Sequence, residues 1–147
     1  MQVEFHVLDE PSEAARLRAA CRLVEAAYTA RQPVLAWCAD AAQLQALDEL
    51  LWTFRDGAFV PHEACDGQAT GPDEAPVRLY CGAPCPAAGG DAVLLNLRET
   101  AVPADCGAGR LIEVIDGDPA RRTAGRERFK AYRERGLAPA HHKFDNV

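Results

Sequence analysis

The run of residues 34–38 (VLAWC) constrains the fold most, because it holds five apolar residues without polar alternation and lies between two helical patterns. Before it, apolar residues recur at three- and four-residue spacing over residues 11–31, until Pro33 blocks the helix. After it, Asp40 is a helix-capping signal, and the same spacing of apolar residues follows it as far as Phe54. A short strand that is apolar on both faces is typical of a parallel sheet covered by helices. The pattern therefore predicts an α/β sandwich with a largely parallel sheet.

Four further strands are predicted around this unit. Alternation from Val3 to Val7 predicts an opening strand, and apolar runs predict strands at residues 77–80, 92–97 and 111–115. Because these later strands follow one another without clear helices, antiparallel edge strands remain an alternative. Two segments, 65–76 and 82–90, are rich in turn residues and are predicted to be loops. We find no repeat or linker, so residues 1–147 are expected to form one domain.

The composition fits an ordinary globular domain. The chain has 147 residues, of which 48% are apolar and 26% charged. A chain of this length can bury a core without disulfides or metals. Its start lacks the pattern of a secretory signal, and no apolar run approaches the length of a bilayer span. We therefore expect a cytoplasmic protein with no membrane contact, in which the six cysteines stay reduced.

The charge is divided sharply between the body and the C-terminal end. Residues 1–118 carry a net charge of −11, whereas residues 119–147 hold 8 basic and 3 acidic residues, a net of +5. Asp118-Pro119 is a helix start and Gly136 a helix stop, so we predict a basic helix over about residues 119–135 and a polar tail over 136–147. Such a basic arm on an acidic body suggests an anionic partner, although a solvated helix face is the common alternative.

The basic residues of this helix fall into two stripes. At about 100° per residue, the first stripe spans about 80°, and it consists of Arg122, Arg126, Lys130 and Arg133. The second stripe consists of Arg121, Arg128 and Arg135. Between the stripes lies a seam of Gly125, Phe129 and Tyr132, through which we expect the helix to dock on the sheet. The first stripe then borders the docking line and offers guanidinium groups suited to carboxylates.

No motif for catalysis is found. Ser12 is the only serine and lies outside a nucleophile elbow, no cysteine is followed by an arginine six residues later, and glycine-rich phosphate loops are absent. We therefore expect no catalytic residues and no cofactor. A thiol enzyme remains a rival, and it would need a cysteine of lowered pKa.

The pattern of cysteines and histidines does not predict a metal site. Four cysteines, Cys65, Cys81, Cys85 and Cys106, lack the spacing of the usual zinc sites, and Cys21 and Cys38 are expected in the core. The histidines, among them His6 and the pair 141–142, have no obvious acidic or cysteine partner, so we expect them to be structural or solvated. We expect no metal.

Three segments together resemble the chi subunit family of bacterial DNA polymerase III. They are residues 47–52 (LDELLW), 59–62 (FVPH) and 126–133 (RERFKAYR), the last followed by Gly136, and the resemblance runs the length of the chain. It implies a single Rossmann-like three-layer domain without catalytic activity. In this family, chi is an accessory subunit in DNA replication that links two proteins. One is psi, a clamp-loader subunit, and the other is single-stranded DNA-binding protein, which is held by its acidic C-terminal tail ending in phenylalanine.

The resemblance also implies two binding surfaces. By motif, Arg126, Phe129 and Lys130 match the tail-binding residues, and we add Arg122 and Arg133 from the same stripe. Phe129 stands where a tyrosine is frequent, so one hydroxyl hydrogen bond is lost. The psi contact is assigned to Trp52, Phe59, Val60 and Pro61, although this segment could instead cover the domain's own core. DNA is expected to be reached only indirectly. The rival function is a single-stranded nucleic-acid-binding module that uses the same basic helix.

Overall fold

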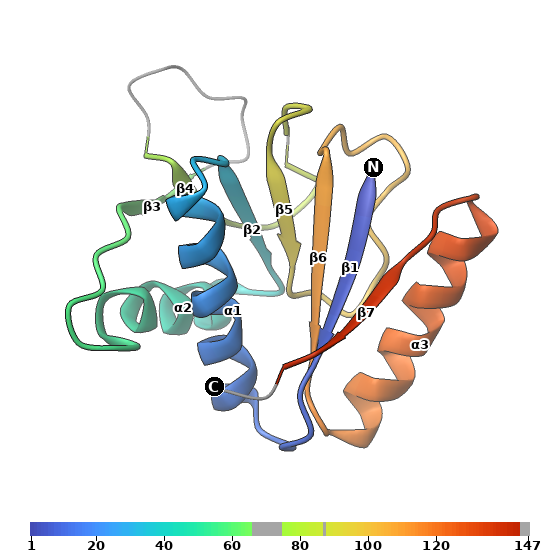
Figure 1. The fold of residues 1–147 in the computed structure, drawn as a ribbon, viewed down its shortest axis with the longest axis horizontal. Helices are drawn as coiled ribbons and strands as arrows, with labels where there is room; N and C mark the ends of the chain where they lie inside the picture. Colours follow the sequence, from blue (N-terminus) through green and yellow to red (C-terminus); the bar gives the residue numbers. More distant parts are fainter. Residues whose placement is uncertain (66–74, 87, 145–147) are drawn as a thin grey trace.

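The chain alternates strands and helices around one sheet (Figure 1). A computed structural model describes residues 1–65, 75–86 and 88–144, so most of the loop predicted over 65–76 lies outside the described residues. The elements, in chain order, are β1 (Gln2–Val7), α1 (Glu13–Thr29), β2 (Val34–Cys38), α2 (Ala41–Thr53), β3 (His62–Ala64), β4 (Val77–Cys81), β5 (Val93–Asn96), β6 (Arg110–Ile115), α3 (Pro119–Glu134) and β7 (Ala140–Lys143).

All pairs in the described seven-stranded sheet are parallel, and the strand order is β3-β4-β2-β5-β6-β1-β7. The α/β class is confirmed, but the alternative of antiparallel edge strands is wrong. The two edge strands, β3 and β7, each follow a helix. Because α2 and α3 carry the chain back along the sheet, the strand that follows each of them starts at the same end as its neighbours and runs parallel to them.

Helices cover both faces of the sheet, which gives three layers. The helices α1 and α2 pack on one face, where Val34, Ala36 and Cys38 of β2 join their core. The helix α3 covers the other face, where Leu35 and Trp37 of β2 join a second core. All five residues of β2 are buried, as the unbroken apolar run predicts.

The strand β7 was not predicted from the sequence. Residues 136–147 were expected to form a polar tail, but Ala140–Lys143 pairs with β1, with His141 opposite Phe5 and His142 opposite His6. All four residues of β7 are exposed, so the segment carries no apolar alternation that would reveal a strand. It leaves β1 with a strand on each side and becomes one edge of the sheet beside α3 (Figure 1).

Among the described residues, no helix has the length and apolar character needed to cross a membrane.

Candidate functional site

The basic helix α3 begins and ends where the sequence predicts. The carboxylate of Asp118 accepts a hydrogen bond from the backbone N–H of Arg121 at 2.9 Å, and Pro119 occupies the first turn. Gly136, with a φ of +87°, follows the helix in the left-handed region that glycine adopts without strain. These two signals set where α3 begins and ends.

The seam between the two stripes docks on the sheet, as predicted. Gly125 lies so close to β6 that a Cβ atom there would be 2.8 Å from the Cδ1 atom of Ile115. The ring of Phe129 packs against Phe5 of β1 with centroids 5.1 Å apart, and Tyr132 is fully buried. The small residue allows α3 to approach β6 closely, and the two aromatic rings fill the space beside it.

The second stripe of arginines holds α3 to the body. The Arg128 guanidinium donates to the buried carboxylate of Glu113 at 3.0 Å, and the hydroxyl of Tyr132 donates to the same carboxylate at 2.6 Å. Asn96 also donates to Glu113. Burial raises the pKa of the Glu113 carboxyl, while the charge of Arg128 and these donated hydrogen bonds oppose that rise. The second stripe therefore satisfies buried polar groups of the domain.

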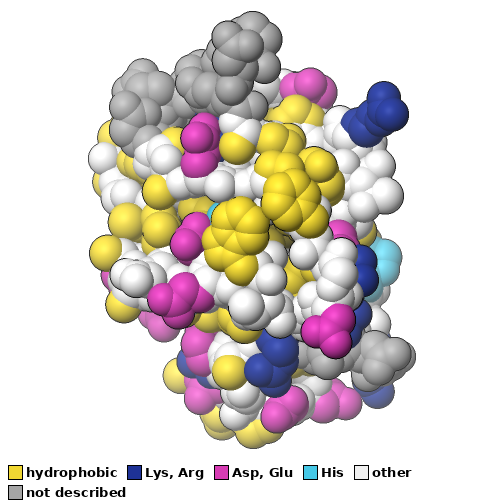
Figure 2. Space-filling model, turned by 90° about the vertical axis from the view of Figure 1, so that its left-hand side faces the viewer, with side chains coloured by type: hydrophobic (Ala, Val, Ile, Leu, Met, Phe, Trp, Pro, Cys, Tyr) yellow, Lys and Arg dark blue, Asp and Glu magenta, His cyan; other side chains and the backbone are white. Residues whose placement is uncertain are grey.

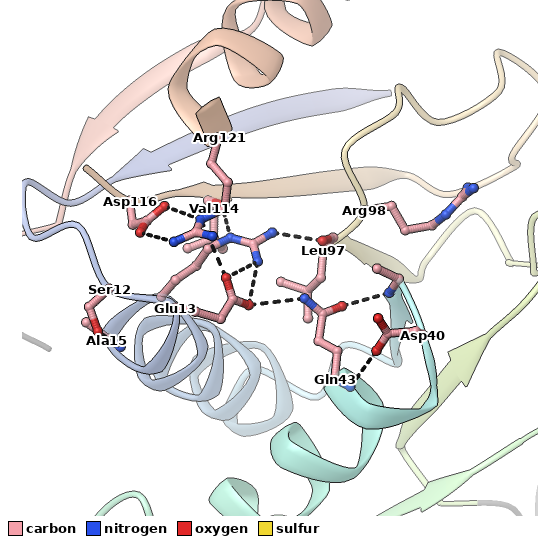
Figure 3. A network of polar contacts seen from close by, with 12 residues as sticks. Ser12, Glu13, Ala15, Asp40, Gln43, Leu97, Arg98, Val114, Asp116 and Arg121 are labelled. Atoms are coloured by element: carbon pink, nitrogen blue, oxygen red, sulfur yellow. Dashed lines mark hydrogen bonds and ion pairs between the residues drawn. The ribbon is translucent and has the colours of Figure 1, made fainter. Parts of the chain in front are cut away.

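The other two arginines of the second stripe are engaged in the same way. Figure 3 shows Arg121 reaching from α3 to Asp116, with its Nε and Nη2 atoms each 2.7 Å from a carboxylate oxygen. Burial acts to raise the pKa of Asp116, but the hydrogen bonds and charge of Arg121 overcome this and hold the pKa below its usual value. Arg135 donates to the carbonyl oxygen of Val102. Arg121 and Arg128 are thus paired with buried carboxylates, whereas Arg135 donates to the backbone from an exposed position.

The first stripe faces solvent. Arg126, Lys130 and Arg133 are exposed, and within residues 1–65, 75–86 and 88–144 their side chains form no ion pair or hydrogen bond. Arg122 is half-buried; it donates to the carbonyl oxygen of Asp116 at 3.2 Å and lies 3.6 Å from the carboxylate of Asp9. At least three positive charges of this stripe are therefore available to an anion.

A hollow lies between the first stripe and the strand β7. Its volume is about 290 Å³, and Arg122, Arg126 and Phe129 of α3 line it. The remaining lining residues are Phe5, Val7, Ile115, Gly125 and His141. We call this the α3/β7 hollow. An adjoining hollow is lined by Arg126, Phe129, Lys130, Arg133 and Glu134. The five residues predicted from the sequence to bind one ligand thus meet along one face, with Arg126 and Phe129 shared by both hollows.

This arrangement suits a ligand that is both apolar and anionic. Phe5, Val7, Ile115 and Phe129 give the α3/β7 hollow an apolar floor, and the guanidinium groups of Arg122 and Arg126 stand at its side. Guanidinium groups bind carboxylates through charge-assisted hydrogen bonds, and an apolar recess beside them favours an aromatic or aliphatic side chain. The hollow is therefore a candidate site for a carboxylate attached to an apolar group.

The structure also supplies residues of this site that sequence reasoning missed. Phe5, Val7 and Ile115 were assigned to strands but not to the site, because a strand pattern does not tell which residues border a helix. His141 enters through β7, the strand that was not predicted. Leu137 before β7 and Phe144 after it pack against the two cores, and these apolar residues are sequence signals that this end of the chain returns to the sheet.

The second predicted surface is an exposed aromatic pair at the opposite edge. Trp52 of α2 is 50% exposed and Phe59 is 65% exposed, and their ring centroids are 6.0 Å apart. Figure 2 looks onto this side and shows hydrophobic side chains gathered in its middle. Val60, in contrast, is fully buried, and Pro61 is half-buried. Of the four residues assigned to psi, only Trp52 and Phe59 present large apolar side chains, because Val60 points into the core.

The crevice at the carboxyl ends of the strands, where open α/β sheets usually bind ligands, is a hollow of about 380 Å³ in which several of the lining arginines are paired internally. Arg16 donates to Glu13 and to the carbonyl oxygens of Leu97 and Val114. Arg121 and Arg128, which also line this crevice, are held by the carboxylates described above. The guanidinium groups in this crevice therefore bind the protein itself.

Three of the six thiols are unsuited to the alternative function of a cysteine enzyme. Burial raises the pKa of Cys21 and Cys38 to about 12, and it raises the pKa of Cys85 to about 11. A raised pKa is the opposite of the activation that thiolate chemistry needs.

The histidines correct one expectation. His62 has the carbonyl oxygens of Val60 and Asp48 at its two ring nitrogens and is structural as expected, but its Nε2 atom also lies 3.0 Å from the carboxylate of Asp48. His6 lies 3.0 Å from the carboxylate of Glu4, two residues earlier on the same face of β1. Both histidines therefore have an acidic partner that the sequence analysis did not identify.

Two comparisons with known proteins agree with each other. Residues 1–140 match the family described as DNA polymerase III chi subunit, HolC. The chain is also 38% identical over 146 residues to the DNA polymerase III subunit chi of Pseudomonas aeruginosa, an alignment that covers 99% of each chain. The resemblance inferred from residues 47–52, 59–62 and 126–133 is thereby confirmed, and this chain belongs to the chi subunit family of DNA polymerase III, whose members are accessory subunits of that replication complex.

Proposed function

We propose that this protein is an adaptor that holds the acidic tail of single-stranded DNA-binding protein in the α3/β7 hollow and psi at the exposed aromatic pair. The observation that carries the proposal is the meeting of an apolar recess with three cations that have no ion-pair partner in the described part of the chain, all on one face of α3. No bond is made or broken. The protein acts by keeping two partners close together.

The proposed ligand matches the recess in chemistry. The aromatic ring of a terminal phenylalanine packs on Phe5, Phe129 and Ile115, and the terminal carboxylate pairs with Arg126. The acidic residues before it run along Lys130 and Arg133 of the adjoining hollow. Because these cations are exposed, the interaction weakens as salt concentration rises.

A calorimetric titration with the tail peptide tests this site. We expect Arg126→Ala to lower affinity about ten- to hundredfold, since loss of one charge-assisted contact costs about 1.5–3 kcal/mol. Arg22→Ala is the matched control, because Arg22 is an exposed arginine of α1, on the opposite face of the sheet. A tail peptide with an amidated C-terminus lacks the carboxylate that pairs with Arg126, so it should bind the wild type less tightly than the free acid does. Its affinities for the wild type and for Arg126→Ala should differ little.

Equal affinities of wild type and Arg126→Ala for the tail peptide would remove the proposed site. The rival function is tested with the same proteins in a gel shift on single-stranded DNA. A nucleic-acid-binding module would retain bare single-stranded DNA without any protein partner, with a steep dependence on salt. The adaptor is expected to bind bare DNA weakly because the body of the chain is strongly acidic.

The exposed aromatic pair supports the proposed psi contact. Two large aromatic side chains side by side on the surface are unusual for a domain that has its own filled core, and aromatic residues dominate the energy of many protein interfaces. The side chain of His62 is fully buried, and its ring centroid lies 4.5 Å from that of Trp52, so it supports the indole from below. The pair is therefore a rigid apolar contact at the edge of the sheet that ends in β3.

Co-purification with psi tests this surface. We expect Phe59→Ala to abolish recovery of psi and to leave the affinity for the tail peptide unchanged, because the two surfaces lie on different elements. Arg126→Ala is the reciprocal control, and it should weaken tail binding while retaining psi. Undiminished recovery of psi by Phe59→Ala would exclude this contact, and loss of both partners would indicate unfolding, which circular dichroism would show.

A further inference from the structure

Two histidines face each other across the strand pair β1–β7, on the face of the sheet opposite the α3/β7 hollow. His6 and His142 are register partners, and their rings stack with centroids 4.9 Å apart and an interplanar angle of 20°. Glu4 lies on the same face, with its carboxylate 3.0 Å from Nε2 of His6. Over the described part of the chain, Glu4, His6 and His142 are the one group of three potential metal ligands, with ligand atoms all within 4.8 Å of one another.

We propose that His6 and His142 bind one divalent transition-metal ion such as Zn²⁺, with Glu4 as the positioning residue for His6. Imidazole nitrogen is a common ligand for zinc, copper and nickel, and both rings belong to neighbouring strands whose pairing holds them together. Water completes the coordination, because His142 lies at the solvent-exposed edge of the sheet.

The ring of His142 must turn before both histidines can bind one ion, because the two rings are stacked and an imidazole nitrogen binds a metal in the plane of its ring. Zinc–nitrogen bonds of about 2.0–2.1 Å in a tetrahedral site bring two ligand nitrogens to about 3.3 Å from each other. One ligand atom each of Glu4, His6 and His142 lies within 4.8 Å of the others, and the exposed side chain of His142 turns without disturbing the core. His6, with only 13% of its side chain exposed, provides the fixed half of the site.

Glu4 fits the positioning role better than the role of a ligand. Its carboxylate already accepts hydrogen bonds from Nε and Nη2 of Arg110 at 2.6 Å and 2.9 Å, so its charge is compensated. A ligating histidine commonly donates its second ring N–H to a carboxylate, which fixes the tautomer and the orientation of the ring. With the Nε2–H group of His6 donated to Glu4, the Nδ1 atom of His6 is left for the metal.

A metal ion at this position would link β1 to β7, because it is bound by one histidine of each strand. The next residue, His141, points to the other face and lines the α3/β7 hollow. An ion that binds only when β1 and β7 are paired stabilises the paired state by mass action. The metal would thereby secure the strand that forms one wall of the hollow, but the site itself does not require that the hollow bind a peptide.

Imidazole nitrogen resonances of the full-length chain, followed by ¹H–¹⁵N NMR while ZnCl₂ is added, test the proposal. We expect ring nitrogen signals of His6 and His142 to shift together and to saturate, while those of His62 stay in place. In His142→Ala, which alters an exposed side chain, the shift of His6 should be lost. In the matched control His141→Ala, it should remain. Because each residue is observed separately, zinc bound by the cysteines does not confuse the result.

Two results would overturn the proposal. One is a wild-type spectrum in which neither His6 nor His142 responds to an excess of ZnCl₂. The other is a His6 shift that persists unchanged in His142→Ala, which would mean that the two rings share no ion. Thermal unfolding gives an independent reading, since ZnCl₂ should raise the midpoint of the wild type and of His141→Ala more than that of His142→Ala.

Discussion

The two cationic stripes of α3 have similar residues and opposite roles. Arg121, Arg128 and Arg135 bind Asp116, Glu113 and the carbonyl oxygen of Val102 inside the domain. Arg126, Lys130 and Arg133, a third of a turn or more away on the same helix, have no such partner among the described residues and border an apolar recess. The net charge of the helix therefore does not measure its capacity to bind an anion.

The difference follows from the strand beneath the helix. Glu113 is the buried acidic residue of β6, and Asp116 directly follows that strand, so the side of α3 that leans toward them is neutralised. The other side leans toward β7 and β1, where Phe5 and Val7 offer only apolar atoms. One side of this predominantly basic helix thus holds it to the body of the protein, and the other side is a candidate binding face. The following predictions test this division.

The largest effect is expected for Arg128→Ala. Removing this guanidinium leaves the buried carboxylate of Glu113 without its charged partner, and breaking a buried ion pair costs about 3–5 kcal/mol in free energy of unfolding. Urea denaturation followed by circular dichroism measures it. The double variant Arg128→Met with Glu113→Gln should recover part of the loss, because no unpaired charge remains. A cost no larger than that of Arg126→Ala would contradict the structural role of this stripe.

The next effect is a pH dependence of the free energy of unfolding, and it comes from the ion pair between Arg121 of the second stripe and Asp116. Because Arg121 holds the pKa of Asp116 below its usual value in the folded chain, Asp116 contributes stability that is complete above its ordinary pKa. This contribution disappears as the pH falls through the lowered pKa. Free energies of unfolding measured between about pH 7 and pH 3 should therefore fall less steeply for Asp116→Asn than for the wild type. Parallel curves would show that this pair contributes nothing.

A smaller effect is expected when the outer cations of the first stripe are removed singly. Lys130→Ala and Arg133→Ala should each weaken binding of the tail peptide about two- to fivefold, because exposed ion pairs contribute about 0.5–1 kcal/mol. Calorimetry at low salt measures the change, and the differences between variants should shrink at high salt. If either variant binds as tightly as the wild type at low salt, that residue lies outside the site.

The smallest effect is expected on the stability of the first-stripe variants themselves. Arg126→Ala, Lys130→Ala and Arg133→Ala should each alter the free energy of unfolding by less than about 0.5 kcal/mol, because no described partner loses a contact. The same urea denaturation serves as the measurement. A large destabilisation by any of them would show that this stripe also holds the domain together.

Local patterns in the sequence determined most of the elements. The unbroken apolar run of β2, the helical spacing in α1 and α2, and the cap and stop of α3 each depend on neighbouring residues, so a single chain reveals them. The same holds for the stripes of α3, because the angle between residues of one helix is fixed by its geometry. The family motifs added the residues Arg126, Phe129 and Lys130.

Only the tertiary structure decided which of these residues share a site. The parallel direction of the edge strands, the return of Ala140–Lys143 to β1, and the burial of Val60 depend on contacts between distant segments. The division of the two stripes has the same cause, since Glu113 and Asp116 meet α3 only after the sheet has formed. Sequence spacing determines which residues are neighbours along one element. Whether a cation of that element is paired inside the protein or available to a ligand depends on whether another element places a carboxylate or an apolar side chain beside it.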